Sequence, residues 1–160
     1  MPEPAGLRAA TPADEAFLRA LYAEVRAPEL APLAWSDAEK RAFCDMQYTL
    51  QDRHYRENYP GAQFLVVETG GHAVGRLIVQ RTPGELRLMD IAIVAAKRGR
   101  GIGGGLVRDL VAEADRAQRA IVLHVERDNP VRPFYRRLGF VDDGENGVYL
   151  RMVRPALNRG

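Results

Sequence analysis

The sequence predicts one mixed α/β domain, with a mostly antiparallel sheet of about seven strands flanked by about four helices. Its 160 residues are close to the size of one ordinary domain. Segments with alternating or continuous apolar residues, typical of strands, are interspersed with segments whose apolar residues recur every three or four positions, as in helices. The predicted order is strand, two helices, three strands, helix, strand, helix and two strands, so residues 1–160 are interpreted as a single domain.

The chain is expected to begin with a strand at Gly6–Ala10 and a helix. The segment Thr11-Pro12-Ala13-Asp14 combines a hydroxyl cap, a proline in the first turn and an acid, which together favour a helix start. Ala27–Trp35 contains two prolines and is predicted to be a loop. Apolar side chains are expected on one face of this first helix at Phe17, Leu18, Leu21, Tyr22 and Val25.

A second and longer helix is predicted from Ser36 to about Asn58. Ser36-Asp37-Ala38-Glu39 is a capping box, in which the serine and the glutamate satisfy each other's backbone N–H groups. The expected apolar side chains of this helix are Phe43, Met46 and Leu50, and Gln47, Gln51 and His54 lie on a neighbouring stripe.

Three strands and a helix should follow. Phe64–Glu68 and Ala73–Arg81 flank a Gly-Gly turn, as in a β-hairpin, and Glu85–Val94 comes after a second turn. A helix is predicted from about Gly101 to Ala117. Its buried face is expected to contain Leu106, Val107, Leu110, Val111 and Ala114.

The C-terminal elements are shorter. Ile121–Val125 is nearly all apolar, as expected for a central strand of a covered sheet. Asn129-Pro130 should begin a helix that ends at Leu138, where Gly139 provides a left-handed stop. Two final strands are predicted near Phe140–Asp142 and Val148–Val153, joined by a turn rich in Asp and Gly.

Composition excludes several classes of protein. The 23 basic and 21 acidic residues nearly balance, which argues against general nucleic-acid binding. A single cysteine, Cys44, cannot form an internal disulfide, and the spacing of His, Cys, Asp and Glu suggests no metal site. No apolar run approaches the ~20 residues of a membrane span. We therefore expect a soluble cytoplasmic protein that does not bind a membrane, and a homodimer is compatible with these observations.

The most specific local feature is a glycine-rich loop at Lys97–Gly105. Five of its residues are glycine, so backbone N–H groups can approach a ligand closely at the positive end of the next helix. Lys97, Arg98 and Arg100 add positive charge. These features predict an anion site, most plausibly for phosphate or pyrophosphate.

Two folds place such a loop between a strand and a helix. Gly99, Gly101 and Gly104 match the GxGxxG pattern of dinucleotide-binding folds, and Glu126 ends the next strand. However, three antiparallel-looking strands precede the loop, and the chain has no room for a second nucleotide-binding half. The pattern is therefore weak evidence for a dinucleotide site.

The loop and a second motif resemble the GNAT superfamily of N-acetyltransferases. Arg98-x-x-Gly101-x-Gly103 after the strand Leu88–Ile93 is similar to that family's acyl-CoA loop. Asn129-Pro130-Val131-Arg132-Pro133-Phe134-Tyr135-Arg136-Arg137-Leu138-Gly139-Phe140 is similar to its N-x-x-A-x-x-F-Y-x-x-x-G-F signature. Ala95 replaces a usual proline, Arg132 a usual alanine, and Pro133 lies in the first turns of its helix. The resemblance implies the acyl-CoA N-acyltransferase fold.

The resemblance also implies acetyl-CoA as the cosubstrate. The backbone of Arg98, Gly99, Arg100, Gly101, Gly103 and Gly104 would hold the pyrophosphate. The strand edge at Ile91 and Ile93 would pair with the pantetheine arm as an added strand does. Asn129 would bind the pantetheine side, with Phe134 packed nearby. In the family this strand and the next one, here Ile121–Val125, splay apart to admit the cofactor.

Two residues are candidates for the proton transfers. Tyr135 matches the family's general acid, and a phenol of pKa near 10 protonates a thiolate of pKa near 8.5 at a cost of about 2 kcal/mol. Arg87 occupies the position where some members have a glutamate base. Asp90 and Glu85 are then the nearest carboxylates, and a water relay is an alternative. A buried Asp90 bonded to backbone amides is equally compatible with its apolar strand.

Acceptor recognition is expected on the second helix and the strands after it, through Gln47, Gln51, His54, Tyr55 and Arg76. Arg76 is equally suited to pair with an acceptor carboxylate or with an internal acid. His124 is interpreted as a satisfied core histidine.

The sequence thus predicts an N-acetyltransferase that moves an acetyl group from acetyl-CoA to a primary amine by direct attack in a ternary complex. The acceptor is a small-molecule amine or a peptide or protein amine. The alternatives are a noncatalytic acyl-CoA sensor and, less favoured, a dinucleotide-dependent oxidoreductase.

Overall fold

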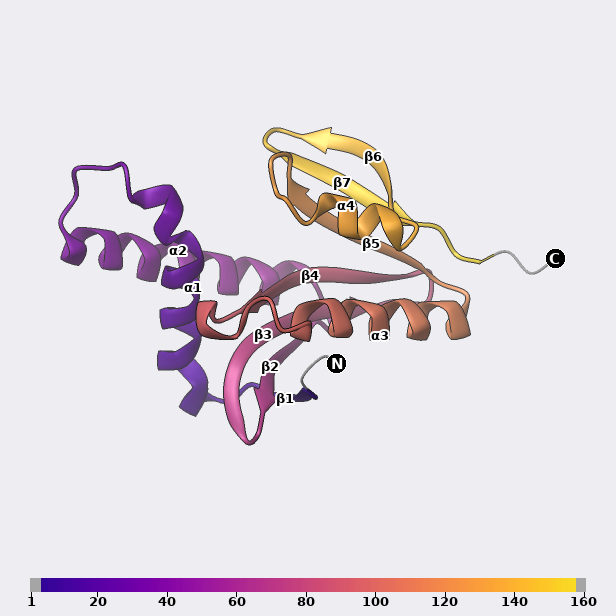
Figure 1. The fold of residues 1–160 in the computed structure, drawn as a ribbon, viewed down its shortest axis with the longest axis horizontal. Coiled ribbons are helices and arrows are strands. Elements are labelled where there is room, and N and C mark those ends of the chain that lie inside the picture. The colour runs from indigo at the N-terminus through magenta and orange to yellow at the C-terminus, as the bar shows by residue number, and fades with distance from the viewer. Residues whose placement is uncertain (1–3, 158–160) are drawn as a thin grey trace.

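The computed structural model describes residues 4–157, which form one seven-stranded sheet with helices on both faces (Figure 1). The strand order is β1-β2-β3-β4-β5-β7-β6, and every neighbouring pair is antiparallel except β4 and β5. This arrangement confirms the predicted fold class and differs from the parallel sheet of a dinucleotide-binding fold. The strands are β1 Gly6–Ala9, β2 Gln63–Thr69, β3 His72–Arg81, β4 Glu85–Ile93, β5 Ala120–Glu126, β6 Val141–Asn146 and β7 Tyr149–Arg154.

Four α-helices and two short 3-10 turns connect the strands. The 3-10 turns are η1 Pro12–Asp14 and η2 Ala95–Lys97. The α-helices are α1 Glu15–Leu30, α2 Asp37–Asn58, α3 Ile102–Ala117 and α4 Arg132–Arg137. The predicted capping box of α2 is present, because Ser36 Oγ accepts from the Glu39 N–H at 3.1 Å and the Glu39 carboxylate accepts from the Ser36 N–H. No helix within residues 4–157 is both long and apolar enough to cross a membrane.

The two faces of the sheet are covered by different helices. On β3, Leu77 and Val79 pack into the main core with α3, whereas Arg76 and Ile78 line a cavity under α1 and α2. This alternation follows from the two-residue period of a strand. The predicted buried face of α3 is confirmed: Leu106, Val107, Leu110 and Ala114 are buried and Val111 packs against them. Tyr135 and Phe140 belong to the same core.

The prediction of a loop from Ala27 to Trp35 is wrong in its first part, because α1 continues through Pro28 to Leu30. Pro28 lies in the last turn, where its missing N–H costs one helix hydrogen bond. Leu30 is buried, and the Ala31 N–H donates to the Ala27 carbonyl at 2.9 Å. Burial of a leucine side chain contributes about 1.5–3 kcal/mol, which offsets that loss. Val25, predicted on the apolar face of α1, is exposed.

The predicted apolar face of α2 is also wrong. Met46 and Leu50 are exposed, and the buried side chains are Cys44 and Tyr48. The helix contacts α1 on one side and the sheet on another. The side chains buried by these contacts are therefore not its most apolar ones. The Tyr48 ring packs against the Tyr22 ring of α1, with the ring centroids 5.8 Å apart.

The turn predicted between the last two strands is mostly strand. β6 extends through the Asp and Gly residues to Asn146, with a register irregularity between Asp142 and Glu145. All six β6 residues are exposed. Because β6 is an edge strand of the sheet, it needs no buried face, and its acidic residues discourage pairing with another chain.

The close approach of β3 to β4 depends on Gly75. A Cβ at this position would overlap the Ala92 carbonyl oxygen and lie 2.7 Å from Ile93 Cδ1. We predict that Gly75→Ala lowers the free energy of unfolding by about 1–3 kcal/mol, because overpacking forces the two strands apart. Urea unfolding measures this change.

The matched control is Gly6→Ala in β1, where a Cβ would meet nothing within 4 Å. Equal stabilities of the Gly75 and Gly6 variants would contradict the proposed steric constraint.

Candidate active site

Strands β4 and β5 separate along their length and leave a gap in the sheet. They pair only from Glu85↔Ala120 to Leu88↔Leu123, although β4 continues to Ile93 and β5 to Glu126 (Figure 1). The Val94 N–H donates to the Val74 carbonyl on β3 at 2.8 Å. Because alternate residues of a strand direct their N–H groups to opposite edges, the N–H groups of Ile91 and Ile93 point toward the gap. This edge is available to an added extended chain.

A bulge in β4 determines on which face of the sheet the Asp90 side chain lies. Ile78 of β3 pairs with Asp90, and Val79 pairs with Leu88, so Met89 is an extra residue in β4. The extra residue shifts the side-chain alternation by one. Asp90 therefore lies on the α2 face, whereas Leu86 and Leu88 face the main core.

The glycine-rich loop forms a cavity of about 220 Å³ beside the end of β4. Gly99 and Gly101 have φ values of 76° and 79°, which favour glycine. A Cβ on Gly104 would lie 3.5 Å from the ring of Phe134, so α4 closes against the loop at this point. The lining residues are Ile93, Lys97, Arg98, Gly99, Gly101, Ile102, Gly103 and Gly104.

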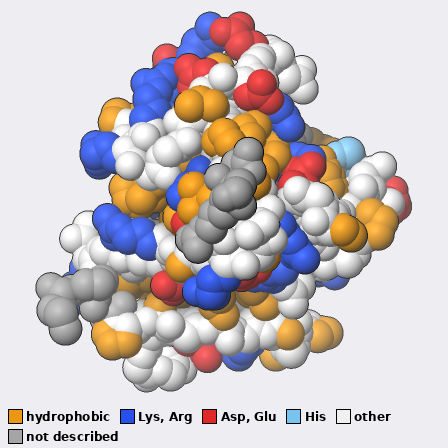
Figure 2. Space-filling model, turned by 90° about the vertical axis from the view of Figure 1, so that its right-hand side faces the viewer, with side chains coloured by type: hydrophobic (Ala, Val, Ile, Leu, Met, Phe, Trp, Pro, Cys, Tyr) orange, Lys and Arg blue, Asp and Glu red, His pale blue; other side chains and the backbone are white. Residues whose placement is uncertain are grey.

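The cations of the loop are held in different ways. Arg98 Nε donates to the Ile93 carbonyl at 2.9 Å, and its Nη2 lies 3.8 Å from Glu24 of α1. Lys97 lines the loop cavity, whereas Arg100 is exposed outside the lining residues. Positive and negative side chains also intermingle on the face of the molecule drawn in Figure 2.

Glu24 is a site residue that the sequence analysis missed. Its carboxylate accepts from the Ala95 N–H at 2.5 Å, which ties α1 to the beginning of the loop. Proline, the residue usual in the resembling family at position 95, has no N–H to donate. The only signal in the sequence was the alanine at that position, since the partner lies 71 residues away.

Tyr135 of α4 is buried in the main hydrophobic core. Its ring contacts Phe134 and Phe140, with centroids 5.8 and 5.4 Å away. No described residue forms a hydrogen bond with its hydroxyl group. Burial raises the pKa of Tyr135 to about 12, and the negative charge of Asp90 adds to this shift. The phenol therefore stays protonated and lies within electrostatic range of Asp90.

Asp90 is paired with a side chain rather than with backbone amides. Its Oδ2 accepts from Arg76 Nε at 2.6 Å, and the Asp90 side chain is 30% exposed. The expectation of a buried acid bonded to amides is thus wrong, because the bulge turns Asp90 toward α2. Arg76 pairs with this internal acid, and its Nη2 donates to Gln51 Oε1 at 2.5 Å. Burial disfavours the Arg76 cation, but Asp90 outweighs this effect and raises the Arg76 pKa.

The predicted acceptor residues of α2 divide into two groups. Gln51 and Tyr55 face Asp90, and burial together with the Asp90 charge raises the pKa of Tyr55 to about 12. His54 is exposed and shares a hydrogen bond with Asn58 at 3.1 Å. Gln47 lies one turn before Gln51 and is partly buried.

Asn129 and His124 lie in the C-terminal part of the chain. Asn129 Oδ1 accepts from the Val131 N–H at 2.9 Å, so its side chain orders the turn that begins α4. His124 is exposed on the outer face of β5, opposite Arg151 of β7, and the core assignment is wrong. Partial burial, Arg87 and Arg151 lower its pKa. Within residues 4–157 no group of three His, Cys, Asp or Glu side chains is placed to hold a metal ion.

A splayed sheet, a glycine cradle at a helix start and a buried tyrosine at the gap together define an acyltransferase. Residues 60–142 match the family model described as the acetyltransferase (GNAT) domain, which covers more than half of the chain. The chain therefore belongs to the GNAT acetyltransferase family. No curated protein matches its sequence.

Solved structures share the whole fold at low identity. The PaiA N-acetyltransferase of Thermoplasma acidophilum, in complex with coenzyme A, is 16% identical with a TM-score of 0.70, over 95% of this chain and 99% of that chain. A structure titled histone acetyltransferase HPA2 and related acetyltransferase, from Corynebacterium glutamicum, is 21% identical with a TM-score of 0.69, over 99% and 98%. The spermidine N-acetyltransferase of Vibrio cholerae, in complex with CoA and spermine, is 21% identical with a TM-score of 0.61, over 93% and 94%.

The raised pKa of Tyr135 predicts a loss of stability in alkali. The unfolded chain releases this proton near pH 10, whereas the folded chain retains it up to about pH 12. The unfolded state is therefore increasingly favoured as the pH rises between these values. On raising the pH to 12, we expect the free energy of unfolding to fall by about 2 kcal/mol less in Tyr135→Phe than in the unsubstituted protein.

Urea unfolding of both proteins at several pH values between about 9 and 12 measures the difference. Identical pH dependence in the two proteins would show that Tyr135 titrates normally in the fold.

Proposed function

We propose that this protein transfers an acetyl group from acetyl-CoA to a primary amine by direct attack in a ternary complex. The observation that carries the proposal is the gap between β4 and β5. The unpaired edge of β4 ends at the glycine cradle, and Tyr135 is close enough to Asp90 of the same strand for the two to interact electrostatically. Residues 1–160 are then assigned to a single N-acetyltransferase domain.

The residues present fit coenzyme A. Gly99, Gly101, Gly103 and Gly104 line the loop cavity with backbone rather than with side chains, which suits close approach of a pyrophosphate. Lys97 and Arg98 supply positive charge, and Arg100 is near enough in the chain to add to it. Ile91 and Ile93 would donate backbone hydrogen bonds to the pantetheine arm, with Asn129 and Phe134 on its other side. When bound, acetyl-CoA supplies the thioester as the electrophile.

Tyr135 is assigned as the general acid. The amine nitrogen forms a bond to the acyl carbon, the carbon–sulfur bond breaks, and the phenol gives its proton to the departing sulfur. With its pKa near 12, this transfer to a thiolate of ordinary pKa is uphill by about 5 kcal/mol, rather than about 2 kcal/mol. Burial of the site also raises the pKa of the departing thiol, so the pKa difference between the phenol and the thiol becomes smaller.

Asp90 is assigned to the proton that the amine must lose. Neutralising an alkyl amine at pH 7 costs about 4.6 kcal/mol, so a nearby acceptor of that proton lowers the barrier. Asp90 is the carboxylate on the α2 side of the gap, and Arg76 holds it in place. Water between Asp90 and the amine serves as the relay where the two do not touch.

The acceptor is assigned to the α2 side of the gap, beside Gln51, Tyr55 and the Arg76–Asp90 pair. Gln47 and His54 extend this surface along the helix. Both small-molecule amines and peptide amines fit this description. Because Arg76 already binds Asp90 and Gln51, its part in acceptor binding is to position Asp90.

Binding and turnover test the function in sequence. We expect isothermal titration to detect CoA binding to the full chain and no binding of NAD or NADP. A thiol-release assay with acetyl-CoA over a panel of amines should then identify an acceptor. Absence of CoA binding by the folded protein would refute the proposal, and CoA binding without turnover on any amine would favour a sensor.

Tyr135→Phe tests the assigned acid. We expect kcat to fall by roughly 10²–10⁴-fold, the usual contribution of a general acid, with little change in CoA affinity. Because the ring remains, the contacts with Phe134 and Phe140 are kept. Phe134→Leu is the control for packing beside the loop. Unchanged turnover of Tyr135→Phe across the pH range would rule out the acid role.

A further inference from the structure

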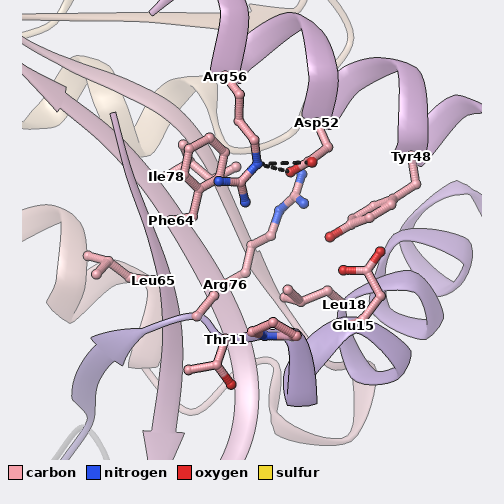
Figure 3. Close-up of a pocket in the computed structure, with 12 residues that line it drawn as sticks. Thr11, Glu15, Leu18, Tyr48, Asp52, Arg56, Phe64, Leu65, Arg76 and Ile78 are labelled. Carbon is pink, nitrogen blue, oxygen red and sulfur yellow. Dashed lines mark hydrogen bonds and ion pairs between the residues drawn. The ribbon is translucent and has the colours of Figure 1, made fainter. Parts of the chain in front are cut away.

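A second and larger cavity lies outside the acyl site, between the N-terminal half of the sheet and helices α1 and α2 (Figure 3). Its volume is about 410 Å³, which is at the small end of the roughly 300–1,000 Å³ found for small-molecule sites. It shares no lining residue with the cavity of the glycine loop. Of the residues predicted for function, Arg76 alone lines it.

One end of this cavity carries two buried donors. Tyr48 is 3% exposed and Arg76 is 6% exposed. Within residues 4–157 the Tyr48 hydroxyl has no hydrogen-bond partner, and Arg76 uses Nε and Nη2 but not Nη1. Figure 3 shows the Tyr48 hydroxyl and the Arg76 guanidinium directed into the same part of the cavity. Neither Tyr48 Oη nor Arg76 Nη1 is among the fully buried, unpartnered polar atoms of the described residues, so both atoms open into the cavity and can bond to an occupant.

The same end also carries two acids. Glu15 is paired with Arg19 at 3.0 Å, and both oxygens of Asp52 accept from Arg56 Nε. Burial raises the pKa of Tyr48, Glu15 raises it further, and Arg76 opposes this shift. Both signs of charge therefore act at the Tyr48 hydroxyl.

The rest of the cavity is apolar. Leu18 and Ile78 are buried, and Phe64 and Leu65 are partly buried. The Arg56 guanidinium covers the Phe64 ring, with its carbon 3.9 Å from the ring centroid. An occupant thus meets a polar end and an apolar wall.

We propose that this cavity binds a free α-amino acid with an apolar side chain. The carboxylate lies toward Tyr48 Oη and Arg76 Nη1, the ammonium group toward Glu15 and Asp52, and the side chain on Phe64, Leu65 and Ile78. A simple carboxylate would face two acids, and a simple amine would face two arginines. A zwitterion matches both, because the four charged lining residues sum to zero.

Calorimetry with the full chain tests the site without any turnover. L-leucine is the probe, and isocaproate, isoamylamine and glycine each lack one of its three recognised groups. We expect leucine to bind and each analogue to bind at least about tenfold more weakly. Equal binding of isocaproate or isoamylamine would refute the zwitterion assignment, and no heat with leucine would refute the site.

Tyr48→Phe locates the binding. The hydroxyl bonds to no residue within 4–157, so its removal leaves the packing against Tyr22 intact. We expect leucine affinity to fall roughly three- to tenfold. The control Tyr22→Phe removes a hydroxyl outside the cavity and should leave affinity unchanged. Unchanged affinity in Tyr48→Phe would refute the assignment.

Tyr135→Phe separates this site from the acyl site, since it should leave leucine affinity unchanged even where acetyl transfer is lost. A parallel loss of leucine binding in that variant would place the amino acid at the acyl site and refute the second site.

Discussion

The early separation of β4 from β5 is the constraint on which the candidate site depends. Only four residue pairs join these strands, and beyond Leu88 the edge of β4 has no partner strand. The gap exposes the open backbone groups of Ile91 and Ile93, and the glycine loop follows directly after this edge. Tyr135 lies in electrostatic range of Asp90 on the same strand. An unpaired edge inside a sheet is costly unless something satisfies it. In this fold the unpaired edge of β4 ends beside the glycine-loop cavity, which Ile93 also lines.

The Arg76–Asp90 pair lies between the candidate active site and the larger cavity under α1 and α2. Asp90 lies on the α2 face of the sheet only because Met89 bulges from β4, and Arg76 Nε donates to its Oδ2 there at 2.6 Å. Arg76 also lines the larger cavity under α1 and α2. Arg76 also donates to Gln51 of α2, and this bond connects α2 to the sheet. Removing either Arg76 or Asp90 would leave the charge of the other residue uncompensated.

Much of the fold was predictable because its signals are local. Apolar patterns, turn residues and helix-capping residues located the seven strands and four α-helices of the described residues, and the capping box located the start of α2. The failures have a common physical origin in packing between distant elements. Burial of Leu30 carried α1 past Pro28, and contacts with α1 and the sheet buried Tyr48 in place of Met46 and Leu50. His124 is exposed on β5, where it lies opposite Arg151 of β7.

By itself, the sequence determined the order of the elements, the glycine loop and the presence of Tyr135 in a short helix beside it. These features depend on backbone conformation and on spacings of a few residues. Only the tertiary structure decided that Arg76 binds Asp90, that Glu24 binds the Ala95 N–H, and that Tyr48 opens into a cavity. The first two contacts join residues 14 and 71 positions apart. Strand register, a one-residue bulge and helix packing create such contacts, and no local pattern encodes them.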